Sequence, residues 1–228
     1  MVRVDDLILR ADGGFTPREL PRRAFAPIDF EGWADVKATG GGMPPAVEQI
    51  VLDFDRDGRL TTRGLATCSA QQVEAATPAQ ARRVCPQAIV GTGRVEALIG
   101  LPGQTPVRVG SALTLFNGPR KGGMPTVVFH ARTSVPAVQT FAISIPIERR
   151  GGYYSYRAVT DVPPIAEGYG ALTRVEIKVG KRFRSGGAKR SYVSARCSDG
   201  ILDTHGRFTF ADGTVIDGAV EKPCRAVR

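Results

Sequence analysis

The chain has 228 residues, a formal net charge of +9, 27 glycines and 16 prolines, and 42% of its residues are hydrophobic. This hydrophobic content excludes a disordered chain, and no apolar run is long enough for a membrane-spanning helix. The positive charge indicates attraction to polyanions, but it does not choose among nucleic acid, anionic cell-wall polymers and acidic membranes.

The N-terminal segment, residues 1–24, is expected to be a polar lead-in. Asp5 and Asp6 interrupt an apolar run that is too short for a signal-peptide core, so a secretory leader would be removed or lie upstream. Ordered β structure is predicted to start near Ala26. Residues 25–228 are predicted to form a single β-sandwich domain.

An acidic hairpin is predicted after an alternating strand at residues 49–55. Asp53, Asp55 and Asp57 stand at alternate positions before a glycine, as in the opening of a calcium loop. The twelfth position of such a loop is Gly64 instead of glutamate, and a strand precedes it instead of a helix. The three aspartates are therefore weak metal candidates. The alternative is a hairpin turn in which Asp53 and Asp55 point to solvent.

A short helical insert is predicted between Cys68 and Cys85. Ser69 can cap a first helical turn, and Thr77 followed by Pro78 is a second helix start. The helix is expected to end at Cys85, because a residue before proline is driven out of the α region.

The chain has four cysteines, and an even number is compatible with two disulfides. Of the three possible connectivities, the sequence-local one is the simplest, with Cys68 joined to Cys85 and Cys197 joined to Cys224. No two cysteines are two to four residues apart, so a zinc site is poorly supported. Disulfides would place the protein in an oxidising compartment. Four reduced thiols in a cytosolic protein remain the alternative.

From residue 88 onward, short apolar runs bounded by glycine, proline, asparagine or aspartate recur at intervals of about ten residues. Their spacing predicts an all-β fold, namely a predominantly antiparallel β-sandwich with the short disulfide-clamped helical insert on one side. Gly91 and Gly93 are followed by Glu96 where a dinucleotide-binding loop needs a third glycine. No cofactor is expected.

Histidine occurs only at positions 130 and 205, and neither lies in a recognised nucleophile motif. His130 falls inside a predicted strand and is expected to be a packed or edge residue. His205 is expected in a turn, where Asp203 would be its partner in acid–base chemistry. Spacing alone does not establish the geometry that such chemistry needs, so no catalytic residue is assigned.

A basic hairpin with interleaved aromatic residues is predicted around the glycines at 186 and 187. Such a surface can follow phosphates and stack on bases, or it can bind an anionic polysaccharide. The alternative is a solvated hairpin whose charges prevent edge pairing with other chains. The candidate anion-binding residues are Lys178, Lys181, Arg182, Arg184, Lys189 and Arg190.

Tyr154 and Tyr156 are two residues apart on a predicted strand, so they are expected on the same face. Two exposed tyrosines there would form a stacking platform for a sugar. The alternative is a pair of buried rings with satisfied hydroxyl groups at the rim of the sheet.

Several segments together resemble a group of uncharacterised, secreted bacterial proteins: GLATC, CPQAIVGTG, LTLFNG, SYVSARC and FTFADG, in this order. The resemblance covers nearly the whole chain and implies a β-rich extracellular domain with two cysteine pairs. It implies no activity and no functional residues. Ser198 follows the third cysteine, where the group often has proline, so the local turn differs.

The leading hypothesis for function is a non-enzymatic extracellular or cell-envelope domain with a structural, adhesive or anionic-glycan-binding role. The cysteines, the positive charge and the lack of catalytic motifs favour it. One alternative is a secreted hydrolase whose site is assembled from distant residues. The other is nucleic-acid binding through the basic hairpin.

Overall fold

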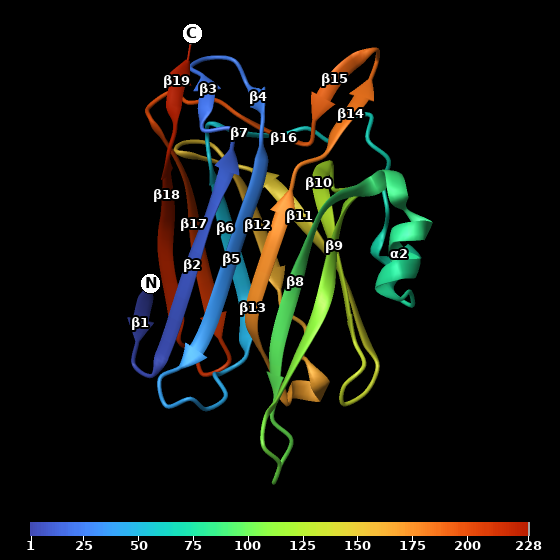
Figure 1. The fold of residues 1–228 in the computed structure, drawn as a ribbon, viewed down its shortest axis with the longest axis vertical. Helices are drawn as coiled ribbons and strands as arrows, with labels where there is room; N and C mark the ends of the chain where they lie inside the picture. The colour runs from blue at the N-terminus through green and yellow to red at the C-terminus, as the bar shows by residue number, and fades with distance from the viewer. Residues whose placement is uncertain (228) are drawn as a thin grey trace.

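The computed structural model describes residues 1–227, which form an all-β fold with two short helices (Figure 1). The strands of the main sheet are β1 (Val2–Val4), β2 (Leu7–Thr16), β5 (Asp29–Ala38), β6 (Val47–Asp55), β8 (Ile89–Ile99), β9 (Val107–Lys121), β10 (Met124–Thr133), β11 (Gln139–Arg149), β12 (Tyr154–Asp161), β13 (Gly170–Val179), β17 (Ile201–Phe210) and β18 (Val215–Pro223). The smaller elements are β3 (Glu19–Pro21), β4 (Ala26–Pro27), β7 (Gly58–Leu60), α1 (Ala70–Val73), α2 (Pro78–Val84), η1 (Pro86–Ala88), η2 (Ala166–Gly168), β14 (Arg182–Ser185), β15 (Ala188–Ser191), β16 (Val193–Ala195) and β19 (Arg225–Val227).

The main sheet has 12 strands in the order β1-β2-β5-β13-β8-β9-β10-β11-β12-β6-β17-β18, and all its neighbours are antiparallel. The sheet curls until its two ends meet. There the ammonium of Lys222 on β18 lies 2.6 Å from a carboxylate oxygen of Asp12 on β2, and Val2 packs against Gly218. The predicted all-β, predominantly antiparallel fold is confirmed. The two layers of the predicted sandwich are opposite walls of one nearly closed sheet.

The hydrophobic core lies between these walls. One part contains Leu9, Val36 and Phe208, from strands near the seam. The other contains Leu115 and Ile145, from strands on the far side. Leu7 and Leu9 on β2, and Phe208 and Phe210 on β17, are buried at every second position, as the two-residue period of a strand requires.

The expectation of a polar lead-in at residues 1–24 is wrong. This segment supplies β1, β2 and β3, and β2 pairs with β5 along its whole length. Leu7, Leu9, Phe15 and Leu20 are buried. The segment is polar on average because its outward residues are charged, and this average hides the inward row of leucines.

The helical insert is confirmed. Ser69 and Thr77 each form a capping box, with Gln72 and Gln80 respectively. A disulfide joins Cys68 to Cys85 across the base of the insert. The insert packs on the outer face of β9 and β10, and the second predicted disulfide, Cys197 to Cys224, is also present. Among residues 1–227, no helix has the length and apolar character needed to cross a membrane.

Candidate polyanion-binding surface

Successive strands of the main sheet run in opposite directions, so the connections between them alternate between the two ends of the sheet. At the upper end in Figure 1 lie residues 17–28, 56–69, 122–123, 150–153, 180–200 and 224–227, which we call the basic end. At the lower end lie residues 5–6, 39–46, 100–106, 134–138, 162–169 and 211–214, which we call the opposite end. The helical insert lies against the side of the sheet and belongs to neither.

Charge is strongly segregated between the two ends. The connections of the opposite end contain no lysine or arginine and four acidic residues, Asp5, Asp6, Glu167 and Asp212. Those of the basic end contain three acidic residues, Glu19, Asp57 and Asp199, and fourteen basic ones: Arg18, Arg22, Arg23, Arg56, Arg59, Arg63, Arg150, Lys181, Arg182, Arg184, Lys189, Arg190, Arg196 and Arg225. The positive charge of the protein is therefore concentrated on one end.

Most of these cations lack a partner of opposite charge. Five of the fourteen form ion pairs, namely Arg56, Arg150, Arg182, Arg196 and Arg225. The other nine form none within residues 1–227: Arg18, Arg22, Arg23, Arg59, Arg63, Lys181, Arg184, Lys189 and Arg190. An end with this many uncompensated cations attracts polyanions over the Debye length of the solution.

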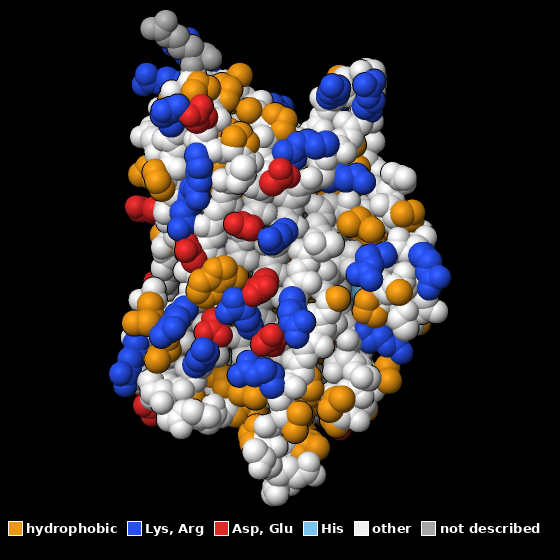
Figure 2. Space-filling view, in the orientation of Figure 1, with side chains coloured by type: hydrophobic (Ala, Val, Ile, Leu, Met, Phe, Trp, Pro, Cys, Tyr) orange, Lys and Arg blue, Asp and Glu red, His pale blue; other side chains and the backbone are white. Residues whose placement is uncertain are grey.

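The predicted basic hairpin is present as β14 and β15, which project from the upper right of the molecule with Lys and Arg side chains at their tip (Figures 1 and 2). In the hairpin, Arg184 lies directly opposite Lys189. Like charges at directly opposed positions destabilise a strand pair. A bound anion between these two side chains would remove that repulsion.

The six candidate anion-binding residues do not form one group. Lys178 lies on β13 in the body of the sheet and contacts Glu31 at 3.5 Å. Arg182 contacts Asp29 at 3.2 Å and donates to the carbonyl of Ile28, so it fixes the base of the hairpin. The remaining four, Lys181, Arg184, Lys189 and Arg190, are cations of the basic end that form no ion pair within residues 1–227.

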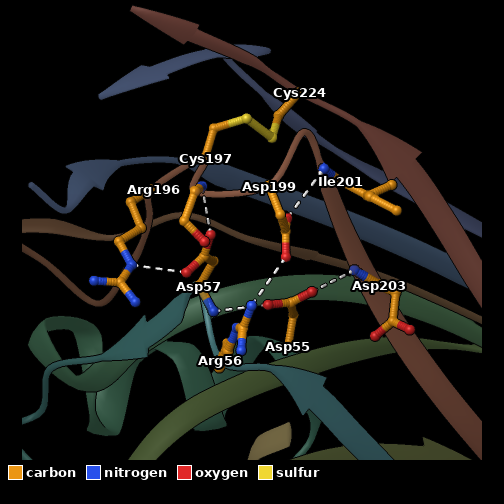
Figure 3. Close-up of polar contacts among 10 residues, drawn as sticks. Asp55, Arg56, Asp57, Arg196, Cys197, Asp199, Ile201, Asp203 and Cys224 are labelled. Carbon is orange, nitrogen blue, oxygen red and sulfur yellow. Dashed lines mark hydrogen bonds and ion pairs between the residues drawn. A yellow bond between two sulfur atoms is a disulfide. The ribbon is translucent and has the colours of Figure 1, made fainter. Parts of the chain in front are cut away.

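A network of hydrogen bonds around the buried carboxylates of Asp55 and Asp57 holds the connections of the basic end in place (Figure 3). Asp57 is fully buried and accepts hydrogen bonds from Arg196 Nε at 2.7 Å and from the backbone N–H of Ser198 at 2.6 Å. Asp55 accepts from the backbone N–H groups of Asp57 and Asp203, at 2.7 and 3.1 Å. The hydrogen bonds to Asp57 fix the connection 180–200 to the turn after β6, and the Cys197–Cys224 disulfide beside this network joins the same connection to the C-terminal segment (Figure 3).

The expected solvent exposure of Asp53 and Asp55 is therefore wrong, because both side chains are buried. Asp53 forms a bidentate ion pair with the guanidinium group of Arg157, and both N–O distances are 2.7 Å. Protein donors occupy the carboxylates that a calcium ion would need. Among residues 1–227, no group of three or more His, Cys, Asp or Glu side chains is arranged to hold a metal ion.

The pKa values of Asp53, Asp55 and Asp57 shift in different directions. Burial raises the pKa of Asp55 above its usual value. Burial also acts to raise the pKa of Asp57, but the hydrogen bonds from Ser198 and Arg196 outweigh it, and the pKa is lowered. The hydrogen bond from Arg157 lowers the pKa of Asp53. Asp53 and Asp57 thus stay ionised and hold their arginines.

The tyrosine platform is not formed. A β-bulge in β12 places Tyr154 opposite Asp55 and Tyr156 opposite Phe54, two adjacent residues of β6 that face opposite sides of the sheet. Tyr156 is buried, and its hydroxyl lies 3.5 Å from the backbone nitrogen of Leu60. The bulge, which sequence alternation does not reveal, separates the two rings.

On the outer face, the structure brings Tyr154 together with the predicted pair of Asp203 and His205. His205 lies within strand β17 instead of a turn. The Tyr154 hydroxyl donates to Asp203 at 3.1 Å, and burial raises the pKa of Tyr154 to about 12. Burial also raises the pKa of Asp203. Tyr154 and Asp203 can therefore hold a proton. The hydrolase alternative stays a prediction, and a hydrolase site here would use Tyr154, Asp203 and His205.

His130 is fully buried in β10 beneath the helical insert, as the prediction of a packed residue has it. Its Nε2 atom lies 3.0 Å from the carbonyl oxygen of Ala76. Burial lowers the pKa of His130, which favours the neutral ring. The residue anchors the insert to the sheet.

Comparison of the chain with protein families, with curated proteins and with solved structures gives no match. The case for function therefore depends on the geometry above. Sequence reasoning found the basic hairpin but missed the cations of the other connections, such as Arg22, Arg23 and Arg63. Assigning alternate connections to alternate ends of an antiparallel sheet would have grouped them.

Proposed function

We propose that this protein is a non-enzymatic extracellular domain that binds an anionic cell-surface polymer through its basic end. The observation that carries the proposal is the segregation of charge between the two ends. One end has nine cations without an ionic partner among residues 1–227, and the connections of the other contain no lysine or arginine. Surface cations normally have anionic neighbours on the same protein face. A surplus of cations on one end of the protein favours binding of a polyanion from outside the protein.

The disulfides support the extracellular part of the proposal. Cys68–Cys85 and Cys197–Cys224 leave no reduced cysteine within residues 1–227. Disulfides persist in oxidising environments and are rare in the cytosol, where nucleic acid would be the commonest polyanion. An anionic glycan or other surface polymer is therefore favoured over DNA or RNA.

The composition of the basic end supports contacts with fixed anionic groups along a chain. Twelve of its fourteen cations are arginines. The planar guanidinium group binds carboxylate, sulfate or phosphate through two parallel hydrogen bonds, which a lysine cannot do. Several such contacts along one polymer release counterions, so the affinity is expected to fall steeply with added salt.

The test uses heparin as a model anionic glycan and compares two double variants. Arg184→Glu with Lys189→Glu reverses the opposed pair of the hairpin, while Arg3→Glu with Arg10→Glu makes the same charge change on β1 and β2. Isothermal titration calorimetry at several salt concentrations gives the affinities. We expect the hairpin variant to bind roughly tenfold more weakly or worse, and the control variant to change by less than about twofold.

Equal losses in the two variants would show that net charge alone drives binding, which would contradict the assignment to the basic end. Tighter binding to duplex DNA than to heparin at physiological salt would favour the nucleic-acid alternative. Release of shortened polymer during incubation would contradict the non-enzymatic part and direct attention to Asp203 and His205. The same titrations and a size analysis of the recovered polymer give all three results.

A further inference from the structure

The interior of the sheet contains a cavity of ≈ 140 Å³ near the opposite end, open to solvent on one side. Its wall is almost wholly apolar. The lining residues come mostly from the half of each strand nearest this end, and they include Val95, Val109, Phe129, Phe141, Ile143 and Leu172. An engineered apolar cavity of about 150 Å³ stays dry and binds benzene, so this space is large enough for a small apolar group.

The packing around the cavity is incomplete for a protein core. Phe129, Phe141 and Ile143 point into the sheet but remain partly exposed, because the space beside them is unfilled. Protein interiors are close-packed, and each void costs the contacts that its wall atoms lack. A wall of large apolar side chains facing a void is typical of a site that a ligand fills.

The polar groups at the wall are already satisfied by the protein. The hydroxyl groups of Ser111, Thr133 and Thr160 donate to backbone carbonyls of Ala112, Val135 and Asp161 respectively. No hydroxyl donor of the wall is left for a ligand. The chemistry of the wall therefore selects a hydrocarbon group over a polar molecule.

The connection 162–169 lines the cavity through Val162, Pro163 and Ile165. Together with the neighbouring connections 100–106 and 134–138 it forms the rim of the cavity, which extends this apolar character to the surface. The connections 100–106 and 134–138 carry no charged residue. Val107, Val135, Val138 and Tyr169 at this end are among the exposed large hydrophobic residues of the protein. Figure 2 shows orange side chains gathered above the β8–β9 connection at the lower tip. A chain that enters the cavity would keep apolar contacts along its length outside it.

We propose that this cavity holds a single hydrocarbon chain, which enters from the opposite end of the sheet. A chain fits better than a compact ring system because the cavity is small and the apolar surface continues from its wall to the rim loops. This site is separate from the basic end, and it binds by apolar burial alone.

The test uses n-alkanols from hexanol to dodecanol, whose neutral hydroxyl group avoids attraction to the basic end. Affinity measured by titration calorimetry is expected to rise about fourfold for each added methylene, the factor that corresponds to about 0.8 kcal/mol per buried CH₂. The rise should stop when the cavity and rim are filled. Affinity that does not depend on chain length would overturn the proposal.

Two variants tie the binding to the cavity. Ala131→Phe fills the space opposite Phe141 and should abolish alkanol binding. Ile143→Ala enlarges the space and should move the limit of the affinity rise to longer chains, which tests the cavity even where the filled variant folds poorly. Val159→Ala, on an exposed side chain of β12 that does not line the cavity, is the control and should bind like the unchanged protein. Equal binding by all three variants would overturn the proposal.

Two further probes separate the sources of the chain. Decanoate supplies an unattached chain, and vesicles of dioleoylphosphatidylcholine supply chains in a neutral membrane. Saturable decanoate binding without vesicle binding assigns the site to a free fatty acid. Co-sedimentation with vesicles that is lost in Ala131→Phe assigns it to a membrane lipid. Binding of neither probe would overturn a lipid chain as the occupant.

Discussion

The two ends of the sheet are built in opposite ways. The basic end has long connections, such as 17–28 and 180–200, and the Cys197–Cys224 disulfide fixes it. The opposite end has short connections without a disulfide, such as 100–106 and 134–138. These long connections pack around a small apolar cluster that contains Leu20, Ile28 and Ala195, and covalent and ionic ties add to this cluster in holding one conformation. Short connections are held by the strands they join.

The two ends also differ in how each would bind a ligand. At the basic end, charge would bind a ligand on the surface, and a rigid support keeps the cations in place without neutralising them. At the opposite end, unfilled space inside the sheet would take an apolar chain, and the connections 100–106 and 134–138 carry no charged residue. One continuous sheet can therefore present two chemically unrelated surfaces, because successive connections lie at alternate ends and each end has its own set of loop sequences.

The largest expected effect is at the buried support of the basic end. Asp57→Ala would leave the Arg196 guanidinium and the Ser198 N–H without their partner in a buried site. Removing one member of a buried ion pair costs about 3–5 kcal/mol of unfolding free energy. Urea denaturation measures the loss. Asp217→Ala, which breaks an exposed pair with Arg207 at 3.8 Å, is the control and should cost under about 1 kcal/mol.

The next largest loss of stability is expected when either disulfide is removed, and the two disulfides differ in their effect on binding. Replacing Cys197 and Cys224 by alanine opens a loop with a sequence separation of 27, and replacing Cys68 and Cys85 opens one of 17. Each change should cost roughly 3–4 kcal/mol, with the longer loop costing slightly more. Thermal unfolding tests the stability. Only the loss of Cys197–Cys224 is expected to weaken heparin binding as well. Equal weakening by both changes would contradict the separation of the basic end from the helical insert.

A smaller effect depends on pH. Because the pKa of Asp53 is lowered in the folded protein, its pair with Arg157 stabilises the fold above the unfolded pKa, for which the usual value is 3.8. This contribution is lost as the pH falls through the lowered value. Asp53→Asn should therefore cost about 1 kcal/mol at pH 7, after allowance for the partly exposed arginine, and progressively less as the pH falls below 3.8. A cost that is independent of pH would show that packing, not the ion pair, is lost.

The smallest effect is at the opposite end. Val138 is 62% exposed in the connection 134–138, so Val138→Ser should change the unfolding free energy by less than about 0.5 kcal/mol. Heparin affinity should be unchanged. Alkanol affinity should fall modestly, because the rim loses an apolar contact. A change in heparin affinity here would contradict the independence of the two ends.

Local signals in the sequence predicted local structure well. Ser69, Thr77 and Pro78 marked the helical insert, and cysteine spacing gave both disulfides. The all-β antiparallel fold followed from apolar runs and turn residues. These features depend on neighbours in the chain, so a single sequence contains the information needed for them.

Features that depend on pairing between distant strands were missed. The bulge that separates Tyr154 from Tyr156 is defined by the register with β6, and the burial of Asp55 is defined by hydrogen bonds from Asp203, far along the chain. The segment of Leu7 and Leu9 was read as polar because its partner strand was unknown. The cavity could not be inferred either, since unfilled volume is a property of the assembled walls.

The closure of the sheet has a further consequence for how the protein behaves when it is crowded. The edge strands of an open sheet are templates for aggregation, because their unpaired backbone groups accept strands of other copies. Here the two edges, β1 and β18, face each other, and the Lys222–Asp12 pair lies across the seam. Molecules gathered densely along one polymer would therefore stay separate instead of joining edge to edge.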